Sequence, residues 1–251
     1  MLIFGYRVPM MASLLFWFVA WEIVGRLGLV FLLPPFSDVL VAMGELFGRP
    51  SFWTATIVTL RSFAVGMFFA ILVGVPLGIL MGRSKAADRL LGMWVNVFVS
   101  APLSALVPIL MILFGLGETT VIMAVFLFAV WIIALDSRAG VGEIQRSLEE
   151  MALSYGASPA QLYGKIIVWA ALPEILAGIR IGFIRGVKGV VIGQLLVSII
   201  GYGEMFELYS RNFLMAEFWA LTILLFAFAM LVAEGVGLVE KRVEFYAGVR
   251  Q

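Results

Sequence analysis

The sequence predicts an all-α polytopic membrane protein, a fold class in which several apolar helices cross the bilayer. Hydrophobic residues make up 63% of the 251-residue chain and charged residues only 13%, with a mean hydropathy of +1.09. So little charge would not keep a domain of this size dispersed in water. The apolar residues also fall into separate runs, each near or above the ~20 residues that a helix needs to cross a bilayer. No internal repeat or linker divides the chain, so we expect a single transmembrane domain over residues 1–251.

Six apolar runs are expected to be the membrane spans. An even number of spans places both termini on the same side of the membrane. The first run lacks a small-residue cleavage site, which favours a retained span over a signal peptide. The six runs cover residues 10–31, 54–82, 90–115, 119–136, 171–200 and 216–239.

The distribution of basic residues predicts which side faces the cytoplasm, because cytoplasmic loops are enriched in Lys and Arg. Of the 17 basic residues, only Arg26, Arg49 and Arg211 fall in predicted loops opposite the termini. We therefore expect both termini in the cytoplasm. The basic residues predicted on the side of the termini are Arg7, Arg83, Lys85, Arg89, Arg138, Arg146, Lys165, Lys241, Arg242 and Arg250.

The segment between the first two runs predicts a short amphipathic helix on the outer surface. It begins at two prolines, and Ser37 and Asp38 then supply side chains that can cap a helix. Apolar residues follow at helical spacing, namely Leu40, Met43, Leu46 and Phe47. Such a helix would lie along the membrane surface and not across it.

The second run carries small residues at regular spacing. Gly66, Gly74, Gly78 and Gly82 lie eight, four and four residues apart. Small residues four apart let helix backbones approach closely in lipid, so we interpret these glycines as a packing face. Pro76 is expected to kink this helix.

The third run contains Pro102 and Pro108 within one predicted span. Prolines free backbone carbonyls, which must then find partners or face a water-lined route. We take both prolines as candidate residues of a substrate pathway.

The polar segment at about 143–168 predicts two short helices joined by a bend. Residues 149–155 are good helix formers, and Gly156 stands where a helix ends, since glycine enters the left-handed conformation at little cost. Ser158 followed by Pro159 is a helix-start signature. A polar elbow between apolar runs is expected to be a docking surface in the cytoplasm.

The fifth run carries Arg180, Arg185 and Lys188 among apolar residues. Charges in lipid are costly, so such side chains usually face a bundle interior or water. Arg180 lies near the end of the run and could bind loop carbonyls. Arg185 and Lys188 lie three residues apart nearer the middle. They could line a pathway for an anionic substrate, or they could pair with acidic residues elsewhere in the chain.

These motifs resemble the membrane subunits of ABC importers of the nitrate, sulfonate and taurine type, over about residues 12–245. The strongest resemblance is to the EAA loop, where Glu150, Ala152 and Gly156 match and Met151 replaces the middle alanine. Three further strings are similar to segments of those permeases, namely TLRSFAVG, GVPLGILMGRS and VSAPLSALVPILMILFGLGE.

The resemblance also shows two departures. Trp169 stands where the family has a proline before the matching Pro173, and Gln194 stands where relatives commonly have glutamate. The first departure, Trp169, affects the angle at which the second helix of the elbow leads into the next span. The second makes the local field less negative and favours an anionic substrate. The segment 201–217 is similar to the loop that follows the fifth span and could contact a binding protein or simply connect two spans.

The resemblance implies a subunit that forms half of a substrate pathway and takes its energy from a partner. In this family two permease subunits pair in a bacterial or archaeal plasma membrane. Two ATP-binding subunits, which hold the ATP and Mg²⁺, dock on the elbows, and a periplasmic or lipid-anchored binding protein delivers the substrate. The expected ATPase-coupling residues are Glu149, Glu150, Ala152, Tyr155, Gly156, Ala157, Ser158, Pro159 and Pro173. The candidate pathway residues are Arg185, Lys188, Gln194, Pro102 and Pro108.

The composition argues against other functions. The chain has no Cys and no His, which removes thiol nucleophiles, histidine bases and the commonest zinc ligands, so no catalytic or metal-binding residue is predicted. It carries no phosphate-binding G-x-x-x-x-G-K-[ST] string and no basic run for nucleic acid. An ion-coupled secondary transporter or an intramembrane enzyme would be the alternatives. The substrate, and whether the paired permease is a second copy, cannot be predicted.

Overall fold

The computed structural model describes residues 2–3, 6–7, 10–197 and 199–247, and nearly all of this part of the chain is helical. The strands β1 (Leu2–Ile3) and β2 (Tyr6–Arg7) form a short antiparallel pair. The helices are α1 Met10–Arg26, α2 Phe36–Gly48, α3 Pro50–Arg83, α4 Lys85–Ser100, η1 Leu103–Leu106, α5 Val107–Phe114, α6 Glu118–Gly142, α7 Arg146–Ser154, α8 Pro159–Leu162, η2 Tyr163–Ile167, α9 Val168–Ala170, α10 Leu172–Val197, α11 Gly201–Arg211 and α12 Met215–Ala247.

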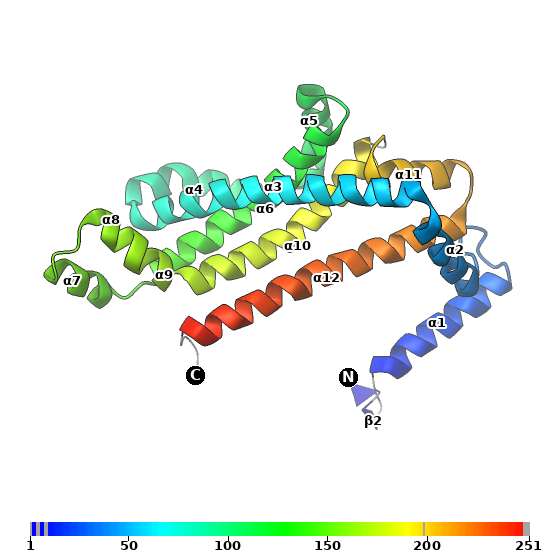
Figure 1. Cartoon of the computed structure of the whole chain (residues 1–251), viewed down its shortest axis with the longest axis horizontal. Helices are drawn as coiled ribbons and strands as arrows, with labels where there is room; N and C mark the ends of the chain where they lie inside the picture. Colours follow the sequence, from blue (N-terminus) through cyan, green and yellow to red (C-terminus); the bar gives the residue numbers. More distant parts are fainter. Residues whose placement is uncertain (1, 4–5, 8–9, 198, 248–251) are drawn as a thin grey trace.

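Three long helices form the centre of the molecule. In Figure 1, α3, α6 and α10 run side by side along the long axis, and α6 packs extensively against both of the others. The short helices α7, α8 and α9 lie together at one end, which we call the elbow end. Helices α2 and α11 lie at the opposite end, which we call the far end.

The three helices approach closely because glycines face the neighbouring backbone. A Cβ atom at Gly78 of α3 would lie 2.5 Å from Ser137 Cβ, and one at Gly182 of α10 would lie 2.6 Å from Ile133 Cγ1. Both distances are far too short for real carbon atoms, so only glycine fits. The prediction of a packing face on the second run is confirmed. The other glycines that α6 contacts in this way are Gly66, Gly74, Gly82, Gly178 and Gly189, and the Cβ position at Gly193 lies 3.2 Å from Ala124 Cβ.

The structure contains three helices that are each long and apolar enough to cross a membrane, among the residues it describes. They are Pro50–Arg83, Glu118–Gly142 and Met215–Val232, and two bent helix pairs bring the possible number to five. The first predicted span coincides with α1, which has 17 residues and falls just short of that length. The six-span topology therefore stays a prediction.

The third predicted span corresponds to a sharply bent pair of helices and not to one straight helix. Helix α4 ends at Ser100, and the pair η1–α5 leaves it at an angle of 98°. Ala101 adopts an extended conformation, with φ −70° and ψ 148°, because the residue before a proline avoids the helical region. As a result α5 projects away from the three central helices (Figure 1).

Two segments at the far end also differ from the prediction. Helix α2 forms as expected, but its buried residues are Val39, Ala42 and Leu46, and Pro35 stands at its cap. Ser37 instead donates its backbone N–H and its hydroxyl to Glu22 of α1, at 2.9 and 3.0 Å. The segment 201–217, expected as a loop, contains helix α11. Its apolar side chains pack into a core with α2, α3 and α12.

Replacing Gly78 by valine should destabilise the central helices. The added carbons would collide with α6, and overpacking of this kind costs about 1–3 kcal/mol. We expect a lower thermal unfolding midpoint for the purified protein in detergent. Gly44→Val is the matched control, since Gly44 lies within helix α2 with nothing within 4 Å of its Cβ position. Equal midpoints for the two variants would contradict this packing.

Candidate functional site

The elbow end begins with helix α7, which stops at a glycine. Gly156 has φ +74°, in the left-handed region that favours glycine. Its N–H donates to the carbonyl of Leu153 at 2.9 Å, and the N–H of Ala157 donates to the carbonyl of Ala152 at 3.0 Å. This pair of bonds is the Schellman arrangement, which satisfies carbonyls left free at a helix end. The predicted helix stop is confirmed.

The elbow has two arms, α7 before Gly156 and the segment α8–η2–α9 after it. The second arm starts with reciprocal capping. Ser158 Oγ accepts from the N–H of Gln161 at 3.3 Å, and Gln161 Oε1 accepts from the N–H of Ser158 at 2.9 Å. Pro159 occupies the first helical turn, as predicted. The chain then continues through the π-helical turn η2 and through α9 before it bends by 62° into α10 near Pro173.

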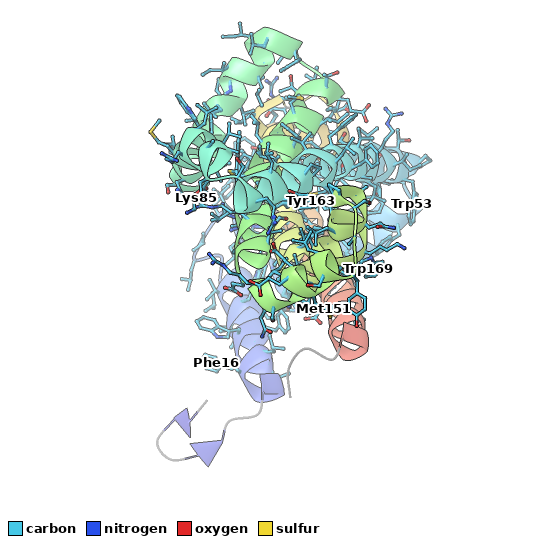
Figure 2. All side chains as sticks on the ribbon, turned by 90° about the vertical axis from the view of Figure 1, so that its left-hand side faces the viewer. Phe16, Trp53, Lys85, Met151, Tyr163 and Trp169 are labelled. Carbon is cyan, nitrogen blue, oxygen red and sulfur yellow. The ribbon has the colours of Figure 1, made fainter. Side chains whose placement is uncertain are left out.

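The elbow is fixed to the central helices by its own small core. Ala152, Leu162 and Ile167 are buried against Val141 of α6 and Ile175 of α10. The tip of the elbow, at Tyr155, lies outside this core, and 87% of the surface of Tyr155 is exposed. The elbow is therefore a supported projection with an open aromatic tip. Figure 2 looks onto this end and shows Met151, Tyr163 and Trp169 on the elbow, with Lys85 of α4 nearby.

Glu149 binds within the chain. Its two carboxylate oxygens accept from Nη1 and Nη2 of Arg83, the last residue of α3, with 2.9 Å between Nη2 and Oε2. The same guanidinium lies over the ring of Tyr163, 5.8 Å from its centroid. Glu150, by contrast, is exposed. Of the two acids expected to take part in docking, only Glu150 is open to an incoming partner.

Arg185 and Lys188 meet different surroundings. Arg185 is half-buried, and its Nη1 donates to the carbonyl of Val99 near the end of α4 at 3.5 Å. Lys188 is exposed beside an apolar groove of about 300 Å³ between α10 and α12. The structure therefore does not bring these two cations together around one cavity of the single chain.

The remaining pathway candidates are also separated. Gln194 is buried between helices, where its amide forms hydrogen bonds with Thr59 Oγ1 of α3 at 3.0 and 3.1 Å. This residue holds α10 to α3. Pro102 and Pro108 are exposed in the bend and at the start of α5.

Sequence reasoning missed an acidic group near Arg185. Asp136 lies on α6 at the point where Gly178 of α10 packs against it. Its Oδ2 is buried without a hydrogen-bond partner among the described residues. Glu174 and Arg185 are close enough to interact with this carboxylate electrostatically. An aspartate at the end of an apolar run is itself a signal, because acids are rare in membrane helices.

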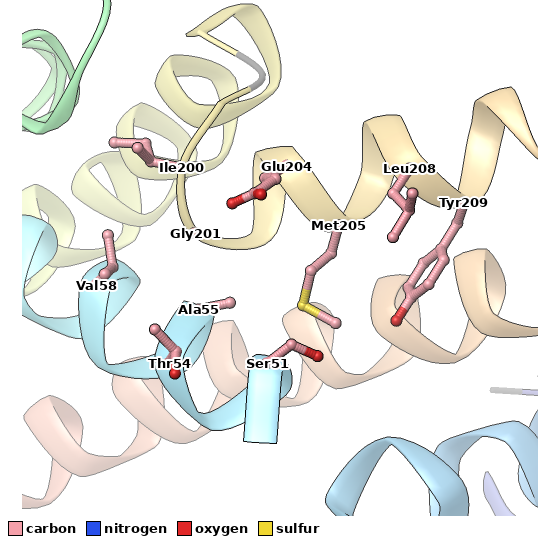
Figure 3. Close-up of a pocket in the computed structure, with 10 residues that line it drawn as sticks. All are labelled: Ser51, Thr54, Ala55, Val58, Ile200, Gly201, Glu204, Met205, Leu208 and Tyr209. Atoms are coloured by element: carbon pink, nitrogen blue, oxygen red, sulfur yellow. The ribbon is translucent and has the colours of Figure 1, made fainter. Parts of the chain in front are cut away.

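The far end carries a pocket of about 370 Å³ between the first turns of α3 and α11. Figure 3 shows Ser51 and Thr54 on one wall and Glu204 and Met205 on the other, with Tyr209 at one end. Burial raises the pKa of Tyr209 above its ordinary value. Glu204 takes part in no ion pair among the residues that the structure describes.

Comparison with known proteins identifies the class of this fold and site. Residues 74–245 match the family described as binding-protein-dependent transport system inner membrane component. The chain belongs to this family and is the membrane component of an ABC importer. The resemblance drawn from the sequence motifs is thus confirmed.

Individual relatives are permeases of several transport systems. The taurine transport system permease protein TauC of Escherichia coli K12 is 34% identical over 194 residues, which cover 74% of this chain and 70% of that protein. The glycine betaine/proline betaine permease ProW of the same strain is 30% identical, with 81% of this chain but only 55% of that protein covered. The formylaminopyrimidine permease ThiX of Halalkalibacterium halodurans is 27% identical, and the match covers 80% of this chain and 78% of that protein.

Solved structures show the same fold. A chain of the MetNI methionine ABC transporter in an inward-facing conformation superimposes with a TM-score of 0.66 at 23% identity, over 78% of this chain and 98% of that chain. An amino acid ABC transporter gives a TM-score of 0.63 at 18% identity, over 79% and 97% of the two chains. At these identities the likeness concerns the fold alone.

Removing the cap of the second arm should loosen the elbow locally. Ser158→Ala deletes the acceptor for the N–H of Gln161, and loss of such a cap costs about 1 kcal/mol. We expect hydrogen exchange of the amides in residues 160–162 to accelerate about fivefold, following the size of that cost. Ser154→Ala is the control, since Ser154 only donates to a carbonyl of its own helix. Unchanged exchange in Ser158→Ala would contradict the cap.

Proposed function

We propose that this chain is the permease subunit of an ATP-driven importer and that its elbow docks on a separate ATP-hydrolysing subunit. The observation that carries the proposal is the geometry of the elbow. Its two short arms are capped on both sides of Gly156, anchored by a buried core and open at Tyr155. A rigid projection with an exposed tip can transmit a displacement of the docked subunit to the membrane helices, whereas a flexible loop would deform instead.

The rest of the expected assembly follows from the family. Two permease subunits would pair, and each would bind one ATPase that holds the ATP and Mg²⁺; this chain itself would hydrolyse nothing. ATP binding would close the ATPases, and the docked elbows would carry that motion into the spans as alternating access. The projecting helix α5, on which Ile112, Leu113 and Phe114 are exposed, supports a surface for pairing.

The same proposal assigns the two ends of the molecule to the two sides of the membrane. The elbow end and both termini would lie in the cytoplasm, because the predicted basic loops gather there. The far end would then face the substrate-binding protein. The pocket between α3 and α11, with Glu204 exposed at its wall, is a surface that such a protein could contact.

The substrate we propose is a small anionic solute. Lys188 is exposed on α10 near the middle of a membrane helix, where an uncompensated charge is costly, so it should face water or a passing anion once two subunits pair. One relative, TauC, is named for taurine, a zwitterion whose sulfonate is an anionic group that a cation such as Lys188 could bind. Arg185 would add to the positive potential from the same helix.

Docking is tested by Gly156→Asp. The left-handed backbone disfavours a side chain by about 1–2 kcal/mol, and a carboxylate would also enter the contact with the ATPase. We expect ATP-driven uptake to be lost or severely reduced while the chain still accumulates in the membrane. Gly164→Asp is the matched control, because Gly164 lies in the same elbow, has no positive φ and has open space around its Cβ position. Uptake at the wild-type rate in Gly156→Asp with ATPase bound would refute the docking role.

The pathway is tested by Lys188→Met, which removes the charge and leaves an unbranched side chain one heavy atom shorter. Taurine would be the first solute tried, and we expect its uptake to fall by about tenfold, the effect of ~1.4 kcal/mol. The amount of assembled complex should not change. Lys85→Met, at an exposed position on α4, is the control that should keep wild-type uptake. Unchanged kinetics in Lys188→Met would remove Lys188 from the pathway.

A further inference from the structure

The three central helices are connected to the elbow in different ways. Helix α6 runs directly into α7 through residues 143–145, and α9 runs directly into α10 through Ala171. Helix α3 has no such link, because α4, α5 and α6 separate it from the elbow along the chain. Any motion of the elbow therefore reaches α6 and α10 through covalent backbone, but it reaches α3 only through non-covalent contacts with α6, with α10 and with the elbow itself.

Among the described residues, Arg83 makes the directional contacts from α3 to the elbow. Its guanidinium binds both oxygens of Glu149 on α7 and lies over the ring of Tyr163 in η2. One side chain thus contacts both arms. Val75 and Ile79 of α3 also pack on the elbow core, but apolar contacts of this kind have no preferred direction and can slide.

We propose that Arg83 is a positioning residue that couples the elbow to α3, so that a push on the docked elbow moves α3 together with α6 and α10. The proposal rests on the proposed function, since it needs an ATPase that moves the elbow. The pair is about three-quarters buried on each side, with 25% of Arg83 and 20% of Glu149 exposed. Its contacts are therefore less screened than those of a surface pair.

The planar guanidinium is what this position requires. Two parallel N–H groups match the two carboxylate oxygens, and the flat face stacks on the tyrosine ring at the same time. A lysine could bind one oxygen as a point charge but could not hold both arms in a fixed geometry. The fixed orientation of the guanidinium between Glu149 and Tyr163, and not only its charge, is then the property that transmits motion from the elbow to α3.

A second ion pair at the elbow end provides a matched control. Arg138 of α6 binds Asp88 of α4, with 2.8 Å between Nε and Oδ1 and 2.9 Å between Nη2 and Oδ2. It has comparable exposure, 33% for Arg138 and 32% for Asp88, but it does not touch the elbow. Breaking it removes a similar ion pair without separating α3 from α7.

The test uses the complex purified with its ATPase. The chain contains no cysteine, so a nitroxide label can be attached to one introduced cysteine at a time. Ile57→Cys reports on α3 and Leu196→Cys on α10, and both positions are exposed. The measurement is the change in label mobility, seen by electron paramagnetic resonance, when the ATPase is trapped with ATP, Mg²⁺ and vanadate.

With Arg83 present, we expect both labels to respond to trapping. In Arg83→Gln the response at residue 57 should be lost and the response at residue 196 kept. Arg83→Lys should behave like Arg83→Gln. The swap Arg83→Glu with Glu149→Arg should restore a partial response at residue 57. The control Arg138→Gln should keep the response at both labels. A merely structural role would weaken both labels together, so equal loss at both sites overturns the proposal. A full response at residue 57 in Arg83→Gln overturns it as well. If neither label responds in the unaltered chain, the proposed function itself fails.

Discussion

The close approach of α6 to its two neighbours is the constraint on which the rest of the structure depends. Glycines on α3 and α10 bring the backbones of these helices against both sides of α6, at distances that admit no Cβ atom. In a bilayer, where lipid is as apolar as the side chains, close packing of this kind replaces the hydrophobic effect as the force between helices. The glycine contacts hold α3 and α10 alongside α6, and the backbone joins the elbow to α6 and α10 but not to α3.

The elbow end and the far end lie at opposite ends of the same central helices and are built differently. At the elbow end the chain folds back on itself in two short capped arms, and ion pairs from Arg83 and Arg138 tie the surrounding helices together. At the far end α2 and α11 share a hydrophobic core, and an open pocket lies between α3 and α11. Between them the charged groups of α10 are kept apart, with Arg185 at a carbonyl of α4 and Lys188 exposed beside α12.

The elbow could be predicted from the sequence because its determinants are local. The left-handed glycine at position 156 and the cap at Ser158 act over a few residues, and the structure confirms both. The prediction of the third span could not include its bend of 98° near Pro102, because an apolar composition does not reveal the angle between two helices. The partner of Glu149 could not be predicted either, since Arg83 lies 66 residues away and meets it only through the packing of α3 on α6. The buried bond of Gln194 with Thr59, 135 residues apart, has the same origin.

The account depends most on the claim that this subunit works with a separate ATPase. The direct measurement is a purification from the native membrane in mild detergent, followed by quantitative mass spectrometry of every protein that co-elutes. We predict one ATP-hydrolysing subunit for each copy of the permease, and the same data would show whether one or two permease species are present. A stable oligomer of this chain alone that transports solute in liposomes without an ATPase would contradict the account.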